Sequence, residues 1–194
     1  MPSTKNYVNN FDPAAGHSRL LQLVRDLAYK DGLDIVLASG KRSDFYIQGK
    51  KVTLHPEGLN LTARLLLKDL EKYPDITAIG GLTMGADPIA SAMAAISFET
   101  GQNLNAFLVR KESKDHGVGS RIEGEISEGE KVAIIEDTVT TGGSARKAID
   151  AVLAVGAVPV VIYALADRED PDADAFRAEF NVHSLFGLAE IRGE

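Results

Sequence analysis

The chain has 194 residues, of which 21 are Lys or Arg and 28 are Asp or Glu, so its formal net charge at pH 7 is −7. This acidic balance argues against nucleic acid as the main partner, because duplex binding normally needs a basic face. Cysteine is absent, which excludes disulfides, thiolate zinc sites and cysteine nucleophiles, and no apolar run reaches the roughly 18 residues of a membrane span.

Length and composition favour one α/β domain over residues 1–194, which is long enough to bury a single core. The first ten residues lack the apolar segment of a signal peptide, so a cytoplasmic location is expected. Apolar residues at helical spacing predict a helix over residues 17–31, and Pro56 suits the first turn of a second helix. Between them, three short apolar runs predict an antiparallel meander within residues 33–55, with strands at 35–37, 45–47 and 52–54.

From residue 77 onward, strands alternate with helices. Apolar runs predict strands at 77–79, 104–109, 132–135, 158–165 and 182–188, and helical spacing predicts helices at 87–99 and 145–155. This alternation indicates a mostly parallel sheet with helices on both faces. Ligands of such sheets bind at the carboxyl ends of the strands. The turn at 80–85, the loop that opens at Arg110 and the side chain of Arg168 are therefore expected at one edge.

Residues 132–144 are the most informative stretch of the chain. Four apolar residues predict a buried strand, Glu136 and Asp137 follow at its end, and a Thr/Gly loop leads into a helix. The N–H groups of such a loop and the positive end of the helix dipole attract a phosphate, while the two carboxylates can accept hydrogen bonds from ribose hydroxyls. We therefore predict a site for a phosphorylated sugar. The alternative is an acidic strand end that only caps the helix.

Residues 110–124 form a long polar stretch with no apolar periodicity, and such a loop in a compact domain is usually functional or disordered. Its cations would suit a diphosphate, since lysine supplies point charges and arginine a planar fork. On charge alone, a solvated surface loop is the alternative. The basic side chains concerned are Arg110, Lys111, Lys114, His116 and Arg121.

Several segments resemble known motifs of one enzyme family. Residues 132–144 resemble the phosphoribosyl pyrophosphate (PRPP) signature of the type I phosphoribosyltransferases, and residues 110–117 resemble the mobile catalytic loop of the orotate phosphoribosyltransferases. Residues 39–46 are similar to the orotate-side segment of that family, and residues 81–88 to its pyrophosphate-side turn. The strand end at 166–169 resembles the one whose Arg meets the orotate carboxylate.

The resemblance implies the type I phosphoribosyltransferase fold, with the meander as a small N-terminal hood. It implies the reaction of orotate with PRPP to give orotidine 5′-monophosphate and pyrophosphate, in the biosynthesis of the pyrimidine nucleotide UMP. The expected cofactor is Mg²⁺, held mainly by substrate and water rather than by direct protein ligands. The expected assembly is a homodimer in which each subunit extends its mobile loop, residues 110–124, into the site of its neighbour.

The resemblance also implies roles for particular residues. The catalytic residues are expected to be Lys114, His116 and Asp137. Orotate is expected to bind Tyr46, Thr140 and Arg168. PRPP is expected to bind Arg110, Lys111, Lys114, His116, Glu136, Asp137, Thr138, Val139, Thr140, Thr141, Gly142, Gly143 and Ser144.

Two departures from the family pattern lie near the diphosphate. Many relatives carry Lys where this chain has Ala38, and often a Tyr-Lys pair where it has Met84 and Gly85, so two cations are missing. Three nearby cations are candidates to compensate: Lys41, Arg42 and Lys50. Two alternative functions also stay open. One is transfer to a different, purine base, and the other is a non-catalytic PRPP-sensing regulator, which would need an added basic face or module.

Overall fold

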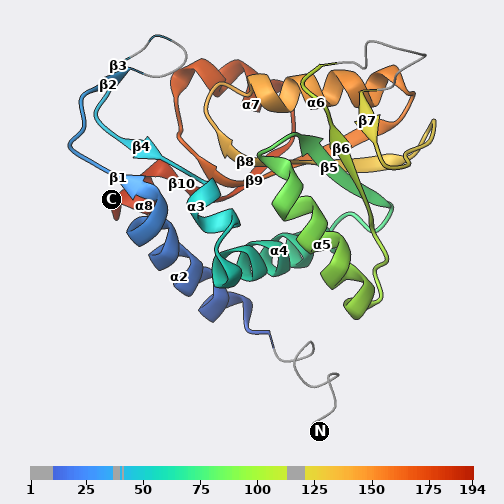
Figure 1. Ribbon diagram of the computed structural model, residues 1–194, viewed down its shortest axis with the longest axis horizontal. Coiled ribbons are helices and arrows are strands. Elements are labelled where there is room, and N and C mark those ends of the chain that lie inside the picture. Colours follow the sequence, from blue (N-terminus) through green and yellow to red (C-terminus); the bar gives the residue numbers. More distant parts are fainter. Residues whose placement is uncertain (1–10, 37–39, 41, 113–120) are drawn as a thin grey trace, which may run out of the picture.

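The computed structural model describes residues 11–36, 40, 42–112 and 121–194, and it is built around a six-stranded sheet (Figure 1). The strand order is β10-β9-β8-β5-β6-β7, and every neighbouring pair is parallel except β6 and β7. The strands are β5 (Ala78–Leu82), β6 (Asn105–Val109), β7 (Ile122–Glu123), β8 (Lys131–Val139), β9 (Val158–Asp167) and β10 (Val182–Gly187). The predicted mostly parallel sheet is confirmed.

Helices cover both faces of this sheet, as predicted. Successive side chains of β8 point to opposite faces, so Ile135 packs with α4 (Pro56–Leu70) and α5 (Ala86–Thr100), whereas Ile134 packs with α6 (Gly143–Ala154). A strand buried on both sides needs a continuous apolar run, which explains the sequence of β8. The helix α7 (Asp174–Glu179) contributes Phe176 to the same face as α6.

The N-terminal helix differs from its prediction at both ends. The helix α2 (Pro13–Leu23) begins at Pro13, because Asp12 caps it by accepting a hydrogen bond from the N–H of Ala14 at 2.9 Å. It continues as a π-helical turn, η1 (Val24–Ala28), and the chain then becomes extended. The predicted span of 17–31 therefore starts too late and ends too late.

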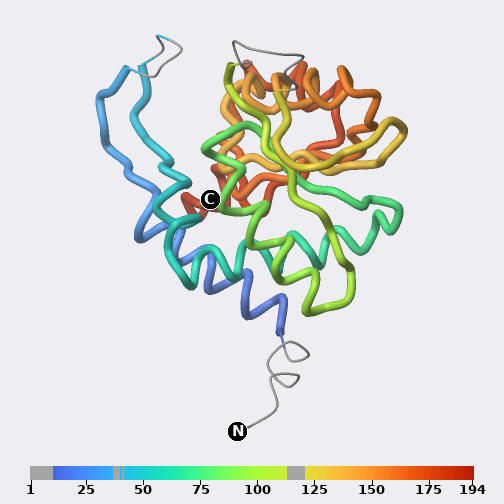
Figure 2. Tube along the Cα trace, turned by 45° about the vertical axis from the view of Figure 1, so that its right-hand side comes forward, coloured from blue at the N-terminus to red at the C-terminus, as the bar shows by residue number. Residues whose placement is uncertain are grey.

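The N-terminal hood consists of two short antiparallel pairs. The strand β1 (Tyr29–Lys30) pairs with β4 (Tyr46–Ile47), and β2 (Ile35–Val36) pairs with β3 (Arg42–Ser43). Figure 2 shows the two chain segments that form these pairs running side by side, apart from the main sheet. Residues 52–54 are not the predicted third strand, because α3 (Lys50–Thr53) turns the chain into the main body and buries Val52 and Thr53 completely.

The C-terminal ends of two strands also differ from the predictions. The strand β5 runs through Gly80 and Gly81 to Leu82, where a turn was expected, and β8 continues to Val139. A Cβ atom at Gly80 would lie 2.0 Å from the carbonyl oxygen of Phe107, so these glycines allow close strand packing rather than a turn. The chain also forms the short helix η2 (Pro171–Ala173), and the short helix α8 (Leu188–Arg192) was not predicted.

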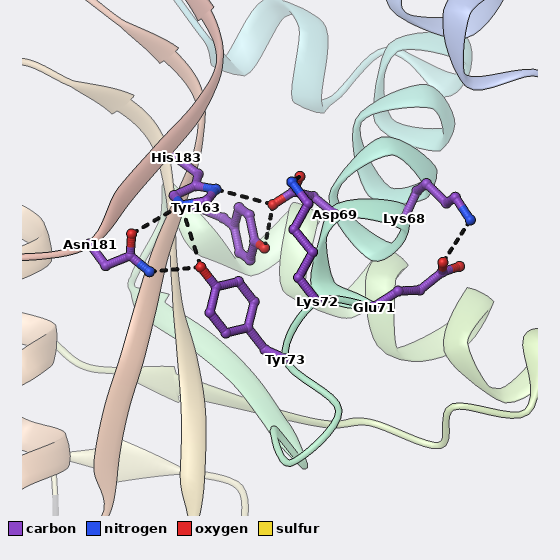
Figure 3. Close-up of polar contacts among 8 residues, drawn as sticks. All are labelled: Lys68, Asp69, Glu71, Lys72, Tyr73, Tyr163, Asn181 and His183. Carbon is purple, nitrogen blue, oxygen red and sulfur yellow. Dashed lines mark hydrogen bonds and ion pairs between the residues drawn. The ribbon is translucent and has the colours of Figure 1, made fainter.

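A polar network joins α4 to the edge of the sheet (Figure 3). Oδ2 of Asp69 accepts a hydrogen bond from the hydroxyl of Tyr163 at 2.7 Å and lies 3.1 Å from Nδ1 of His183. Lys72 also pairs with Asp69. The network therefore ties a helix to β9 and β10 through one carboxylate. Within the part of the chain that the structure describes, no helix is both long and apolar enough to cross a membrane.

Candidate active site

The hood and the carboxyl ends of β8 and β9 enclose a cavity of about 540 Å³. Six predicted site residues line it: Tyr46, Asp137, Thr138, Thr140, Thr141 and Arg168. The other lining residues all come from the hood and the start of α3: Ile35, Val36, Ile47, Gln48, Gly49 and Lys50. Residues more than 90 positions apart in sequence therefore meet at one site. This site lies at the carboxyl ends of the strands, where the sequence predicts ligand binding.

Glu136 and Asp137 lie inside β8 and are nearly buried, with 6% and 9% of their surface exposed. The backbone N–H of Asp137 donates to Oε1 of Glu136 at 3.1 Å, and the N–H of Thr138 donates to Oδ1 of Asp137 at 2.9 Å. Burial, together with the hydrogen bond and charge of Asp137, raises the pKa of Glu136 to about 8. At neutral pH the two carboxyl groups therefore carry close to one negative charge.

Two glycines hold the backbone close against this acid pair. A Cβ atom at Gly85 would lie 2.9 Å from Oδ1 of Asp137 and 2.9 Å from Oε1 of Glu136. A Cβ atom at Gly49 would lie 2.8 Å from Oγ1 of Thr138. These distances are shorter than ordinary contacts, so a side chain at either position would force Thr138 or the two carboxylates to shift.

The loop after β8 presents backbone donors at the start of α6. Gly142 has φ of +78°, and a Cβ atom there would lie 2.3 Å from Cγ of Phe176, so only glycine fits. No side chain of the described residues caps α6, which leaves the first N–H groups available to an anion. Gly143 and Ser144 are exposed at this end, whereas Val139 is buried in the core and offers only backbone atoms.

Arg168 also lines the cavity and is only 5% exposed. Its Nη2 donates to Oγ of Ser43 at 3.2 Å, and its guanidinium carbon lies over the ring of Phe45. Burial lowers the pKa of this guanidinium, but an arginine stays charged at any physiological pH. The Nε atom is buried and has no partner among the described residues, so the side chain keeps an unused donor.

The long loop is only partly described. Nη1 of Arg110 pairs with Oε1 of Glu123 at 3.1 Å, and Arg110 does not line the cavity. Lys111 is exposed. Lys114 and His116 lie outside the described residues. Of the predicted diphosphate cations, the two that the structure describes, Arg110 and Lys111, do not line the cavity with Asp137.

Sequence reasoning missed one contact of the site and left a choice among three cations open. Phe45 belongs to the segment that resembles the family's orotate side, but its contact with Arg168 joins residues 123 positions apart and has no local signal. Lys50 was one of three candidate cations, and only the fold distinguishes it. Its Nζ lies 3.1 Å from Oδ2 of Asp137, whereas Arg42 pairs with Asp34 at 2.7 Å and Lys41 lies outside the described residues.

Comparison with known proteins agrees with this geometry. The phosphoribosyl transferase domain model matches residues 48–189. The chain is 45% identical over 161 residues to an orotate phosphoribosyltransferase of Nostoc sp., an alignment that covers 82% of this chain and 77% of the relative. The crystal structure of Mycobacterium tuberculosis orotate phosphoribosyltransferase with Fe(III) dicitrate matches with a TM-score of 0.77 at 38% identity, over 91% of this chain and 98% of that chain.

A second crystal structure of the Mycobacterium tuberculosis enzyme, in complex with PRPP, matches with a TM-score of 0.73 at 35% identity, over 91% of this chain and 99% of that chain. The match to the domain model includes the acid pair and the strand end at Arg168, and the alignments with these relatives cover most of the chain. The chain therefore belongs to the orotate phosphoribosyltransferase family and has the type I phosphoribosyltransferase fold.

Proposed function

We propose that this protein transfers the phosphoribosyl group of PRPP to orotate, giving orotidine 5′-monophosphate and pyrophosphate for pyrimidine synthesis in the cytoplasm. The observation that carries the proposal is a single cavity lined by Asp137 of the buried acid pair, by the loop that leads to an uncapped helix N-terminus, and by a buried arginine. A sugar phosphate fits the first two features. A base that carries a carboxylate fits the third.

The 5′-phosphate is expected to bind the loop from Thr140 to Ser144, where the N–H groups at the start of α6 are directed at it. Thr138 adds a hydroxyl whose Oγ1 is buried and has no partner among the described residues. Asp137 then accepts hydrogen bonds from the ribose hydroxyls, and Glu136 lies beneath it. The assignment follows the order of these residues along the chain, in which the two carboxylates come first and the phosphate-binding loop follows.

The bond from the anomeric carbon to the diphosphate oxygen breaks, and a bond to a ring nitrogen of orotate forms. The transition state carries positive charge on the ribose ring. Asp137, close to that ring, stabilises this charge electrostatically, so no nucleophilic side chain is required. Lys114 and His116 are assigned to the negative charge that develops on the leaving diphosphate, with Arg110 and Lys111 as supporting cations.

Arg168 is assigned to the orotate carboxylate, because its unused Nε and the fork geometry of a guanidinium suit a planar anion. Tyr46 and Thr140 line the same cavity and are assigned to the rest of the base. A purine offers no carboxylate to this arginine. The arrangement therefore favours orotate over a purine base.

Mg²⁺ fits this donor set as a substrate-bound ion. No group of three or more acidic or histidine side chains able to hold a metal occurs within the described parts of the chain. Mg²⁺ commonly keeps several waters and binds through substrate phosphates and one or two carboxylates, which Glu136 and Asp137 can supply in its outer shell. When bound, it would neutralise the diphosphate.

A direct absorbance assay tests the activity. Loss of orotate absorbance is expected only when the protein, PRPP and Mg²⁺ are all present, and no product is expected with adenine, hypoxanthine or uracil. Turnover of a purine instead of orotate would contradict the assignment of Arg168. PRPP binding without turnover of any base would favour the PRPP-sensing regulator.

A homodimer that shares the loop 110–124 is also part of the proposal, on the strength of the family resemblance. Two inactive variants, Lys114→Ala and Arg168→Ala, test it after mixing and exchange of subunits. A hybrid dimer would hold one site with both wild-type residues, so activity is expected to return to a fraction of the wild-type value. Hybrids that form but stay inactive would indicate that each loop serves its own subunit.

A further inference from the structure

Among the described residues that line the cavity, Lys50 and Asp137 form an ion pair that joins its hood side to β8. Lys50 is the first residue of α3, and its Nζ lies 3.1 Å from Oδ2 of Asp137. The side chain of Asp137 is 12% exposed, whereas that of Lys50 is 45% exposed. The carboxylate is therefore fixed in place, and the ammonium group has room to move.

The charges of the empty site balance through this pair. The ammonium group of Lys50 lies 3.1 Å from the carboxylate of Asp137 and offsets its charge. When ribose hydroxyls donate to Asp137, they take over the hydrogen bond that the ammonium group makes. PRPP also brings a diphosphate into the cavity, which attracts the cation that has been displaced.

The other cations near the cavity are less suited to this exchange. Among the described residues that line it, the only other cation is Arg168, which is buried under Phe45 and bonded to Ser43. Arg42 pairs with Asp34 on the far side of the hood. Lys51 is exposed and does not line the cavity. Lys50 therefore combines access to the site with a partner that the substrate replaces.

We infer that Lys50 is a positioning residue that exchanges partners during substrate binding. In the empty enzyme it holds and neutralises Asp137, and when PRPP binds it turns from Asp137 to the diphosphate. Lys50 thereby supplies a cation for the diphosphate in a chain that has alanine at position 38 and glycine at position 85. The inference rests on the proposed function, in particular on Asp137 as the ribose-binding residue.

Calorimetric titration of the full-length protein with PRPP and Mg²⁺ tests the inference without relying on turnover. Lys50→Met removes the charge but keeps the length, and it is expected to weaken PRPP binding by at least about tenfold while the KM for orotate changes less than about threefold. Lys50→Arg is expected to restore most of the affinity. Lys51→Met changes the net charge equally and serves as the matched control, with affinity expected within about twofold of wild type.

Measurements in the Asp137→Asn variant distinguish partner exchange from a role in which Lys50 only holds Asp137 in place. If Lys50 acts only by holding Asp137, then adding Lys50→Met to Asp137→Asn has no further effect on PRPP affinity. Partner exchange predicts a further loss of at least about threefold, because the diphosphate still loses its cation. Thermal melting checks that each variant folds, and Lys50→Gln replaces Lys50→Met in the same comparison if the latter does not.

Two results would overturn the inference: wild-type PRPP affinity in Lys50→Met, or a silent Lys50→Met in the Asp137→Asn background. Either could occur while the wild-type protein binds PRPP and converts orotate, so the proposed function would stand. A wild-type protein that binds no PRPP, or an Asp137→Asn variant with unchanged affinity, would contradict the proposed site itself. The two failures are therefore distinguishable.

Discussion

The guanidinium carbon of Arg168 lies 4.2 Å from the centroid of the Phe45 ring, and that of Arg192 lies 4.9 Å from the same centroid. The ring therefore orders Arg168 from the hood, while Arg192 fixes the ring from α8 through contacts with Tyr29 and Asp44. An arginine held in this way keeps its fork directed without a carboxylate partner of its own. The hood and the C-terminal helix thus cooperate at the base-binding side.

Replacing Phe45 with Leu removes the aromatic face but keeps an apolar side chain. A cation–π contact is worth about 0.5–2 kcal/mol, so the KM for orotate should rise about 2- to 30-fold. The KM for PRPP should change little, because the acid pair and the phosphate loop are untouched. Steady-state kinetics with each substrate varied in turn measures both values. Phe98→Leu, at an exposed position on α5, is the control, and an equal effect on both substrates would argue against the contact.

The β-α alternation could be predicted from sequence because each strand of the sheet is buried on both faces and reads as an apolar run. The acid pair at Glu136 and Asp137 was found for the same reason, since two carboxylates directly after such a run are unusual. Their depth was underestimated, because β8 continues to Val139 and encloses them. The local pattern marks the residues, but only the neighbouring strands determine how far the strand extends.

The remaining errors have tertiary causes. Val52 and Thr53 have strand-forming side chains, yet their burial against α4 and η1 makes them helical, so tertiary packing overrides propensity. Gly80 and Gly81 resemble a turn, but they allow β5 to pack closely against the backbone of its neighbours. The ion pair of Lys50 with Asp137 spans 87 positions, and no periodicity in the sequence encodes such a contact.

Glu136 should make stability depend on pH in an unusual direction. Burial raises its pKa to about 8 in the folded state, from an ordinary value of 4.5, so the folded protein binds more protons than the unfolded chain between these values. Stability should therefore fall as pH rises from about 5 to 8. Glu136→Gln removes this dependence, so its melting temperature relative to wild type should be higher at pH 8 than at pH 5. A difference in melting temperature between the two proteins that stays the same from pH 5 to pH 8 would contradict the assignment.

Asp69 should act in the opposite direction. Burial alone would raise its pKa, but hydrogen bonds from Lys72, Tyr163 and His183 outweigh burial and lower the pKa below its ordinary value of 3.8. Its stabilising effect is therefore fully present above pH 4 and is lost as pH falls through the lowered folded value. Asp69→Asn should lower the melting temperature at pH 7 and less so near pH 3. Asp150→Asn, at an exposed position on α6, controls for loss of one carboxylate, and an Asp69→Asn deficit that is constant with pH would exclude an electrostatic origin.

Gly85 and Gly81 allow a comparison between site geometry and fold stability. Gly85 has φ of −79° and ψ of −47°, which alanine adopts freely, but the new Cβ would lie 2.9 Å from one oxygen of each carboxylate in the acid pair. Side-chain oxygens can shift, so Gly85→Ala should fold with a melting temperature close to wild type. Because Asp137 is displaced, kcat/KM for PRPP should fall by at least about tenfold.

At Gly81 the new Cβ would lie 2.1 Å from the backbone carbonyl oxygen of Ile135, which cannot move without distorting β8. Gly81→Ala should therefore lower the melting temperature strongly, and its activity should fall with the folded fraction. Thermal melts and PRPP kinetics on both variants separate the two effects. If Gly85→Ala keeps wild-type kinetics, the acid pair either moves without consequence or does not bind the ribose. If Gly85→Ala instead unfolds like Gly81→Ala, the turn after β5 supports the fold rather than the position of the carboxylates.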